Sequence, residues 1–186
     1  IRYIPDMKFN NRENEKVYTD DGRTVWLSRS PAVAVVIVAT INFEDPRVLT
    51  VIRGSGVNNT GKTCLPCGYL DWDESGPEGA MRELYEETNI NLTEMLEVSD
   101  SYSLYWGEPW YINTNPAEDD LQNITLYYGV HVNFKSEEEL PKLSGENAAP
   151  NEVESVFWSP RREVGLYDWA FNHEKRIEKF YSWVNL

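Results

Sequence analysis

Apolar and β-branched residues gather in short runs that are separated by polar stretches, a pattern typical of strands in a sheet. Turn-forming residues, such as Glu44-Asp45-Pro46 and the loop 54–61 (GSGVNNTG), separate these runs. The pattern predicts strands at 33–41, 48–52, 63–70, 98–106, 124–134 and 153–158.

Two stretches have helical character, at 77–89 and at 172–184. Residues 1–30 are polar and irregular, and Asp21-Gly22 between two short apolar runs is suited to the turn of a short hairpin. We therefore expect an N-terminal extension at 1–30 and one domain at 31–186. Strands on both sides of a central helix predict an α/β (α+β) fold in which helices enclose a mixed β-sheet.

The helix predicted at 77–89 carries Glu83, Glu86 and Glu87 at positions i, i+3 and i+4, so three carboxylates share one face. Like charges at this spacing destabilise a helix by roughly 0.2 to 0.5 kcal/mol per pair. A bound divalent cation would offset the repulsion, and hard oxygen ligands select Mg²⁺ or Mn²⁺. The alternative is an ordinary acidic helix exposed to solvent.

The residues around this helix resemble the Nudix box, written G-x5-E-x7-R-E-U-x-E-E-x-G-U with U an aliphatic residue. Asn89 departs from the motif, which has glycine there, but asparagine tolerates the left-handed conformation that ends a helix. Cys67 also stands where most members have a glycine next to the first glycine of the box. The residues that match the motif are Gly68, Glu74, Arg82, Glu83, Leu84, Glu86, Glu87 and Ile90.

This similarity implies a Nudix-like α/β/α sandwich and a site for Mg²⁺ or Mn²⁺. By resemblance, Glu86 and Glu87 are the principal metal ligands and the carbonyl of Gly68 completes their set. Glu83 is either a further ligand or the base that activates the attacking water.

Arg82 is expected to support the metal site rather than to bind the metal. It can pair with Glu74 or with Glu78 and so hold the loop against the helix. The alternative is an unpaired arginine on the surface.

Other candidate site residues lie outside the box helix. The general base can also come from a later loop, where Glu152 and Glu146 are the candidates. Arg53 ends a predicted strand where related proteins often place a cation that binds phosphate, and a guanidinium suits that role. Tyr69 and Trp72 lie in the box loop and are candidates for contact with a ligand.

The charge of the chain excludes one class of partner. Thirty-one acidic residues against 17 basic residues give a formal charge of −14, the wrong sign for binding duplex DNA or RNA. The longest apolar run, at 32–39, is far shorter than the ~18 residues of a membrane-spanning helix. We expect a cytoplasmic protein with no membrane partner.

Two cysteines, Cys64 and Cys67, lie three positions apart on the strand predicted at 63–70. Their side chains would then point to opposite faces, which makes a disulfide awkward. A zinc site would need His131 and His173, which are distant in the sequence, so structural thiols are the favoured interpretation.

These features favour hydrolysis of a pyrophosphate bond in a nucleoside diphosphate linked to another moiety: ADP-ribose, a nucleotide sugar, a dinucleotide or a nucleoside triphosphate. One alternative is a Nudix-fold module that senses nucleotides without cleaving them. Another is the isoprenoid diphosphate isomerase branch, which the ordinary sequence TCLPCG around the cysteines disfavours. The aromatic segment 102–111 (YSLYWGEPWY) either stacks a nucleobase, packs internally or forms the surface of a homodimer.

Overall fold

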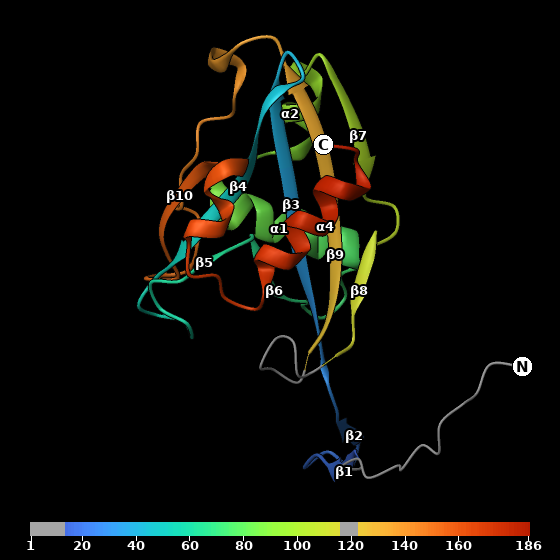
Figure 1. Ribbon diagram of the computed structural model, residues 1–186. Helices are drawn as coiled ribbons and strands as arrows, with labels where there is room; N and C mark the ends of the chain where they lie inside the picture. The colour runs from blue at the N-terminus through green and yellow to red at the C-terminus, as the bar shows by residue number, and fades with distance from the viewer. Residues whose placement is uncertain (1–13, 116–122) are drawn as a thin grey trace, which may run out of the picture.

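The computed structural model describes residues 14–115 and 123–186, so the first 13 residues of the expected extension lie outside it. One mixed sheet follows the path β10-β4-β3-β9-β7, with β5 on β4, β6 on β3 and β8 on β9 (Figure 1). The central strands β3 (Ser30–Ile41) and β9 (Asn123–Phe134) run parallel, and the other pairs are antiparallel. The remaining strands of this sheet are β4 (Glu44–Arg53), β5 (Thr63–Cys64), β6 (Cys67–Tyr69), β7 (Ser101–Tyr105), β8 (Tyr111–Asn113) and β10 (Val153–Pro160). In the described ranges, β1 (Glu15–Tyr18) and β2 (Thr24–Leu27) form a separate two-stranded sheet.

Helices cover both faces of the sheet, α1 (Gly76–Thr88) on one and α4 (His173–Trp183) on the other (Figure 1). Side chains of β3 alternate between these layers. Val35 packs in the cluster with Leu84 of α1, whereas Val36 packs in the cluster with Phe180 of α4. Because both faces are buried, the sequence of β3 is continuously apolar. The arrangement confirms the predicted α/β sandwich.

The turn predicted at Glu44–Pro46 is wrong, because β4 already begins at Glu44. The chain reverses one step earlier, at Asn42 and Phe43, which both have positive φ, 51° and 63°. Two contacts with the end of β9 and the residue after it hold this turn. Phe43 N–H donates to the side chain of Asn133 at 2.6 Å, and Asn42 donates to the carbonyl of Lys135 at 3.0 Å.

The single strand predicted at 63–70 is also wrong, because Leu65-Pro66 divides it into β5 and β6. Each half pairs with a different neighbour, β5 with β4 and β6 with β3. Pro66 has no N–H to donate, and its carbonyl accepts a hydrogen bond from Val35 N–H at 2.9 Å. The break brings both cysteines into one small apolar cluster instead of onto opposite faces, and both thiols are free.

Capping residues fix both ends of helix α1. At its start the carboxylate of Glu78 accepts a hydrogen bond from Ser75 N–H at 2.7 Å. At its end Asn89 adopts the left-handed conformation, with φ of 60°, and its N–H donates to the carbonyl of Tyr85. The side-chain oxygen of Asn89 also accepts a hydrogen bond from Asn147 at 2.8 Å, a contact that glycine would lack.

Several short elements carry no clear signal in the sequence. Helix α2 (Leu92–Val98) follows α1 directly and is capped by the side chain of Asn91. The others are β8 and two 3₁₀ turns, η1 (Glu137–Glu139) and η2 (Arg161–Leu166). Such segments are too short to show a period of their own.

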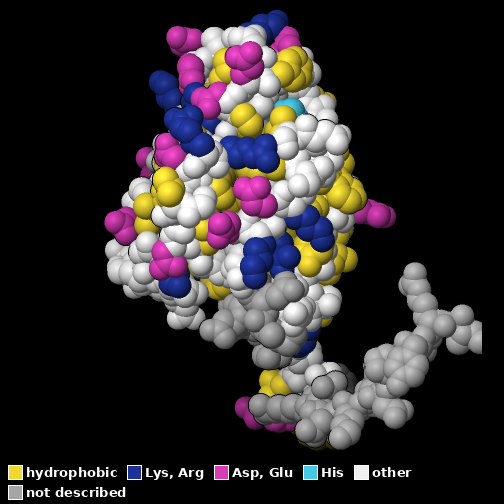
Figure 2. All heavy atoms as spheres, in the orientation of Figure 1, with side chains coloured by type: hydrophobic (Ala, Val, Ile, Leu, Met, Phe, Trp, Pro, Cys, Tyr) yellow, Lys and Arg dark blue, Asp and Glu magenta, His cyan; other side chains and the backbone are white. Residues whose placement is uncertain are grey.

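The surface over α4 is not uniformly acidic, although the formal charge of the chain is −14. Lys and Arg side chains are interspersed with Asp and Glu on this face (Figure 2). Of the helices in the described ranges, none has both the length and the apolar character needed to cross a membrane.

Buried His173 anchors the first turn of α4 to the sheet. Its Nδ1 accepts a hydrogen bond from Leu65 N–H at 3.0 Å, and the edges and faces of Tyr127 and Phe171 enclose the ring. Burial, together with the nearby positive charges of Arg53 and Arg176, lowers the pKa of His173 to about 3. The imidazole is therefore neutral at physiological pH.

Replacing Asn89 tests the end of α1. We expect Asn89→Ala to lower the free energy of unfolding by about 1 to 2 kcal/mol, because alanine is strained in the left-handed conformation. Asn89→Gly is the matched control, since glycine adopts this conformation freely. Urea denaturation of both variants measures the effect, and equal stability of the alanine and glycine variants would contradict it.

Acid sensitivity tests the neutral state of His173. Between the folded pKa of about 3 and the ordinary histidine pKa of 6.5, the unfolded chain binds a proton that the folded chain does not, so stability falls as pH falls through this window. From pH 7 to pH 5, wild type should lose about 2 kcal/mol more than His173→Asn, which retains an acceptor for Leu65 N–H. Urea denaturation at both pH values measures this difference, and parallel losses in the two proteins would refute the assignment.

Candidate active site

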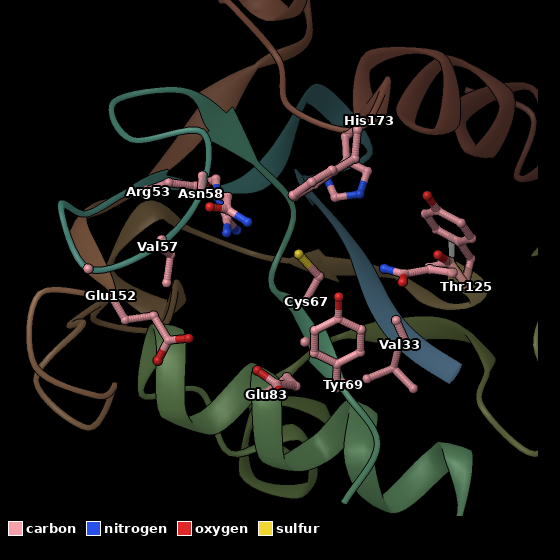
Figure 3. Close-up of a pocket in the computed structure, with 16 residues that line it drawn as sticks. Val33, Arg53, Val57, Asn58, Cys67, Tyr69, Glu83, Thr125, Glu152 and His173 are labelled. Carbon is pink, nitrogen blue, oxygen red and sulfur yellow. The ribbon is translucent and has the colours of Figure 1, made fainter. Parts of the chain in front are cut away.

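A cavity of about 420 Å³ opens between α1, the strands β3, β6 and β9, the loop after β4 and the start of α4. Residues far apart in the sequence meet there. Glu83 and Glu152 lie at one end and His173 and Thr125 at the other, with Cys67 between them (Figure 3).

Gly68 and the box helix are in direct contact at the cavity. A Cβ added at Gly68 would lie 2.1 Å from Oε1 of Glu83, so only glycine allows the carboxylate to approach the strand so closely. Next to it, Cys67 N–H donates to Oε2 of Glu87 at 2.9 Å. These contacts place two carboxylates of α1 against β6.

Both carboxylates are buried, and the positive charge near them does not fully compensate their negative charge. Glu83 is 7% exposed and Glu87 is 2% exposed. Burial raises the pKa of Glu83 to about 6, although Arg82 acts in the opposite direction. Burial also raises the pKa of Glu87 well above its ordinary value, and the acidic groups of Cys67, Glu83 and Glu152 add to the effect. A cation bound beside Glu83 and Glu87 would therefore stabilise their negative charges.

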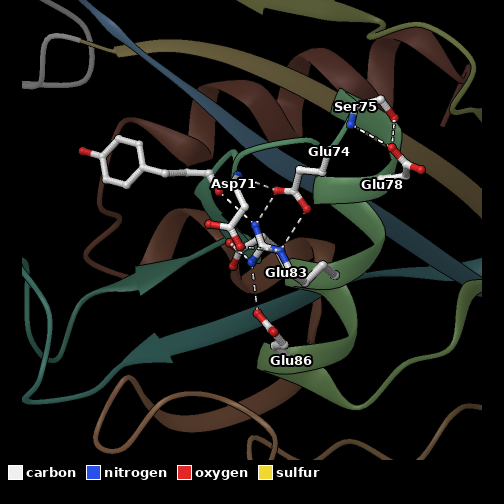
Figure 4. Close-up of polar contacts among 8 residues, drawn as sticks. Asp71, Glu74, Ser75, Glu78, Glu83 and Glu86 are labelled. Atoms are coloured by element: carbon white, nitrogen blue, oxygen red, sulfur yellow. Dashed lines mark hydrogen bonds and ion pairs between the residues drawn. The ribbon is translucent and has the colours of Figure 1, made fainter. Parts of the chain in front are cut away.

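Arg82 joins the box loop to the helix (Figure 4). Its guanidinium binds both carboxylate oxygens of Glu74, with Nη2 to Oε1 at 2.7 Å, and it donates to the carbonyl of Tyr69 at 2.9 Å. Nη1 also lies 2.7 Å from Glu83 and 3.0 Å from Glu86. Glu74 is thus the partner, whereas the alternative, Glu78, binds Ser75 at the start of α1.

The donor set suits a divalent cation such as Mg²⁺ or Mn²⁺, since carboxylate oxygens and a backbone carbonyl are hard ligands. The buried charge on Glu83 and Glu87 would be offset by such a cation. Within the described residues, however, no three acidic, histidine or cysteine side chains are already arranged around one position. Arg82 now neutralises Glu83 and Glu86, so a metal would have to share or replace this contact.

Arg53 places a positive charge at the cavity. Its Nε donates to the carbonyl of Asn58 at 2.7 Å, Nη1 lies 3.8 Å from Sγ of Cys64, and the guanidinium stacks over Phe171 at 5.0 Å. Burial opposes the positive charge of Arg53, but the nearby acidic groups of Cys67, Cys64 and Glu87 raise its pKa overall. No ion pair among the described residues joins Arg53 to a carboxylate, so the guanidinium keeps its charge and can bind an anion in the cavity.

The structure distinguishes the two candidates for the general base. Glu152 lines the cavity, and its charge contributes to the raised pKa values of Glu83 and Glu87. Glu146 is exposed and does not line the cavity.

The aromatic candidates separate in the same way. Tyr69 lines the cavity and is half-exposed at its rim (Figure 3). Trp72 is 94% exposed and is not among the residues that line the cavity, so its contact with a ligand stays a prediction. The segment 102–111 does not line the cavity either. Trp106 packs against Tyr128, and Trp110 against Phe180, which favours the internal packing alternative for these rings.

Sequence reasoning missed the far end of the cavity. Asn58, Thr125, Phe171 and His173 come from three separate segments of the chain, and the fold brings them together. The zinc alternative for the histidines gains no support either, because within the described residues no three histidine, cysteine or acidic side chains lie around one position.

Comparison with known proteins identifies the fold and the family. The family model for the NUDIX domain matches residues 30–184. The NUDIX domain of Shewanella oneidensis NrtR, solved with ADP ribose, superposes with a TM-score of 0.61 at 20% identity, covering 84% of this chain and 89% of that one.

Two other solved structures show the same fold. An Ap4A hydrolase of C. elegans gives a TM-score of 0.59 at 15% identity and covers 83% of this chain and 98% of that one. A bifunctional NMN adenylyltransferase/ADP ribose pyrophosphatase of Francisella tularensis, complexed with AMP and a Mn ion, gives 0.54 at 22% identity and covers 83% of this chain and 41% of that one. The family resemblance that the box indicated therefore extends over nearly the whole described domain. The chain belongs to the NUDIX domain family.

Proposed function

We propose that this cavity cleaves the pyrophosphate bond of a nucleoside diphosphate linked to another moiety, with Mg²⁺ or Mn²⁺. The observation that carries the proposal is the opposition of charges in one cavity. The buried carboxylates of Glu83 and Glu87 favour a cation, and the guanidinium of Arg53 in the same cavity can bind an anion. A metal-bound diphosphate supplies both.

The metal would be held by Glu83, Glu86, Glu87 and the carbonyl of Gly68. When bound, divalent cations neutralise phosphate charge and activate the attacking water. Arg82 keeps Glu83 and Glu86 on one side of the helix and ties them to the box loop.

The remaining roles belong to side chains that line the cavity. Arg53 binds phosphate oxygens through a guanidinium already oriented by Asn58. Glu152 accepts the proton of the attacking water, because it faces the cavity close to Glu83. Tyr69 contacts the ligand at the rim.

The substrate class is supported by the ligands of similar proteins, which are ADP ribose, AMP and, by name, Ap4A. All contain a nucleoside with phosphate. We further propose that residues 31–186 carry the activity and that 1–30 are an appended segment. A NUDIX-fold sensor that binds nucleotides without cleaving them is the alternative that the following experiments address.

Removal of the metal ligand Glu86 tests the reaction. We expect a panel of ADP-ribose, nucleotide sugars, dinucleotides and nucleoside triphosphates to include a substrate cleaved with Mg²⁺ and not after EDTA treatment. Glu86→Gln should lower kcat at least about a hundredfold, since it removes a direct ligand. Glu97→Gln on α2, an exposed carboxylate outside the cavity, is the control. Tight binding of panel members with no turnover under any metal condition would support the sensor instead.

The identity of the base is tested by a matched pair. We expect Glu152→Gln to lower kcat about a hundredfold or more, whereas Glu146→Gln, on the same loop, leaves it unchanged. The pair separates the two because only Glu152 lines the cavity. Steady-state kinetics with the substrate found above measures both, and similar rates for the two variants would contradict the assignment.

A further inference from the structure

A buried histidine, His173, is among the polar side chains at the far end of the cavity. His173 lines the cavity across from Glu83 (Figure 3), and the ring is 2% exposed. Neither the box nor the opposition of charges described above gives this side chain a role.

The hydrogen bond to the backbone decides which nitrogen carries the proton. Nδ1 accepts a hydrogen bond from Leu65 N–H at 3.0 Å. It therefore uses its lone pair for this bond and carries no hydrogen. The ring is neutral because of burial and its positive neighbours, Arg53 and Arg176. A neutral imidazole has one N–H, so the proton lies on Nε2 and that atom is a donor only.

Packing fixes where this donor lies. Tyr127 meets the ring at 6.0 Å with an interplanar angle of 87°, and Phe171 meets it at 5.4 Å with an angle of 62°. Across residues 14–115 and 123–186, the hydrogen bond recorded for this side chain is the one at Nδ1. A buried donor is ordinarily satisfied, so an occupant of the cavity is expected to supply the acceptor.

Charge selects the kind of acceptor. Arg53 lies near enough to His173 for its charge to act on the ring, as does Arg176, which is 6% exposed. Their positive potential disfavours a cationic group of a ligand and favours an oxygen that bears negative charge. Phosphate oxygens and the carbonyl oxygens of a base share this chemistry.

We propose that His173 is a specificity-determining residue whose Nε2–H donates to an oxygen acceptor on the part of the substrate farthest from the cleaved bond. This proposal rests on the proposed function, because it takes the ligand to be the substrate of that reaction. The binding role of His173 can nevertheless be tested without hydrolysis. It predicts a preference for ligands that place an unprotonated oxygen at this end of the cavity.

Two substitutions separate this role from the structural role of the ring. His173→Gln can place its amide N–H₂ near the position of Nε2, whereas His173→Asn can place its oxygen near Nδ1 and serve Leu65 N–H alone. We expect KM to rise about tenfold in His173→Asn with kcat little changed, and to stay within about threefold of wild type in His173→Gln. The reverse order, or equal KM values in all three proteins, would overturn the proposal.

A spectroscopic measurement on the unmodified protein guards against variants that fold poorly. In ¹⁵N-labelled wild type, we expect the His173 nitrogen shifts of a neutral ring protonated at Nε2, and a perturbation of the Nε2 signal on ligand binding. A proton on Nδ1, or an unperturbed Nε2 signal with a saturating ligand, would count against the proposal.

Two probes distinguish the sources of the oxygen. Calorimetric titration with Mg²⁺-pyrophosphate tests phosphate oxygens alone, and titration with uridine, whose base has two carbonyl oxygens, tests a nucleoside without phosphate. Weaker binding of either probe to His173→Asn than to His173→Gln supports the proposal and names the source, and equal binding of every probe overturns it. Because titration needs no turnover, a protein that binds with this difference but cleaves nothing would refute only the proposed function.

Discussion

The contact between Arg82 and its acidic partners is the interaction on which the site depends. One guanidinium joins the box loop, through Glu74 and the carbonyl of Tyr69, to the carboxylates of Glu83 and Glu86 on α1. Without it, the loop that leaves β6 and the helix that follows would have no charged link, and like charges on α1 would repel one another. Because the planar fork of arginine binds several oxygens at fixed angles, lysine could not make the same set of contacts.

The sheet supplies the second constraint. Parallel pairing of β3 and β9 places the starts of two sequence-distant strands side by side, and β6 lies along the same end of β3. Gly68 thus reaches the helix, while Thr125 reaches the cavity from the neighbouring strand. The pairing therefore forms one wall of the cavity, which α1, the loop after β4 and the start of α4 complete.

The residues that could be predicted from the sequence are those whose geometry is local. The box helix, its three carboxylates and the pairing of Arg82 follow from spacings of three, four and eight residues, which a helix and a tight loop reproduce. Long apolar runs likewise identify β3 and β9. The division of β5 from β6, the turn at Asn42-Phe43 and the position of His173 could not be predicted in this way, because each is decided by a partner elsewhere in the fold, such as Asn133 or Leu65. Trp72 shows the converse, since proximity in sequence to Gly68 did not bring it into the cavity.

The electrostatics of the cavity connect stability with binding. The raised pKa values of Glu83 and Glu87 mean that their negative charges are less stable in the folded protein than in water, whereas nearby acidic groups favour the positive charge of Arg53. The two carboxylates therefore oppose folding when the cavity holds only water, and a cation would compensate them. A metal would bind with part of its affinity supplied by the relief of charges already fixed in position, and would stabilise the fold. The neutral ring of His173 differs from these groups because it adds direction without charge, so it can select among ligands that the charged end of the cavity accepts equally.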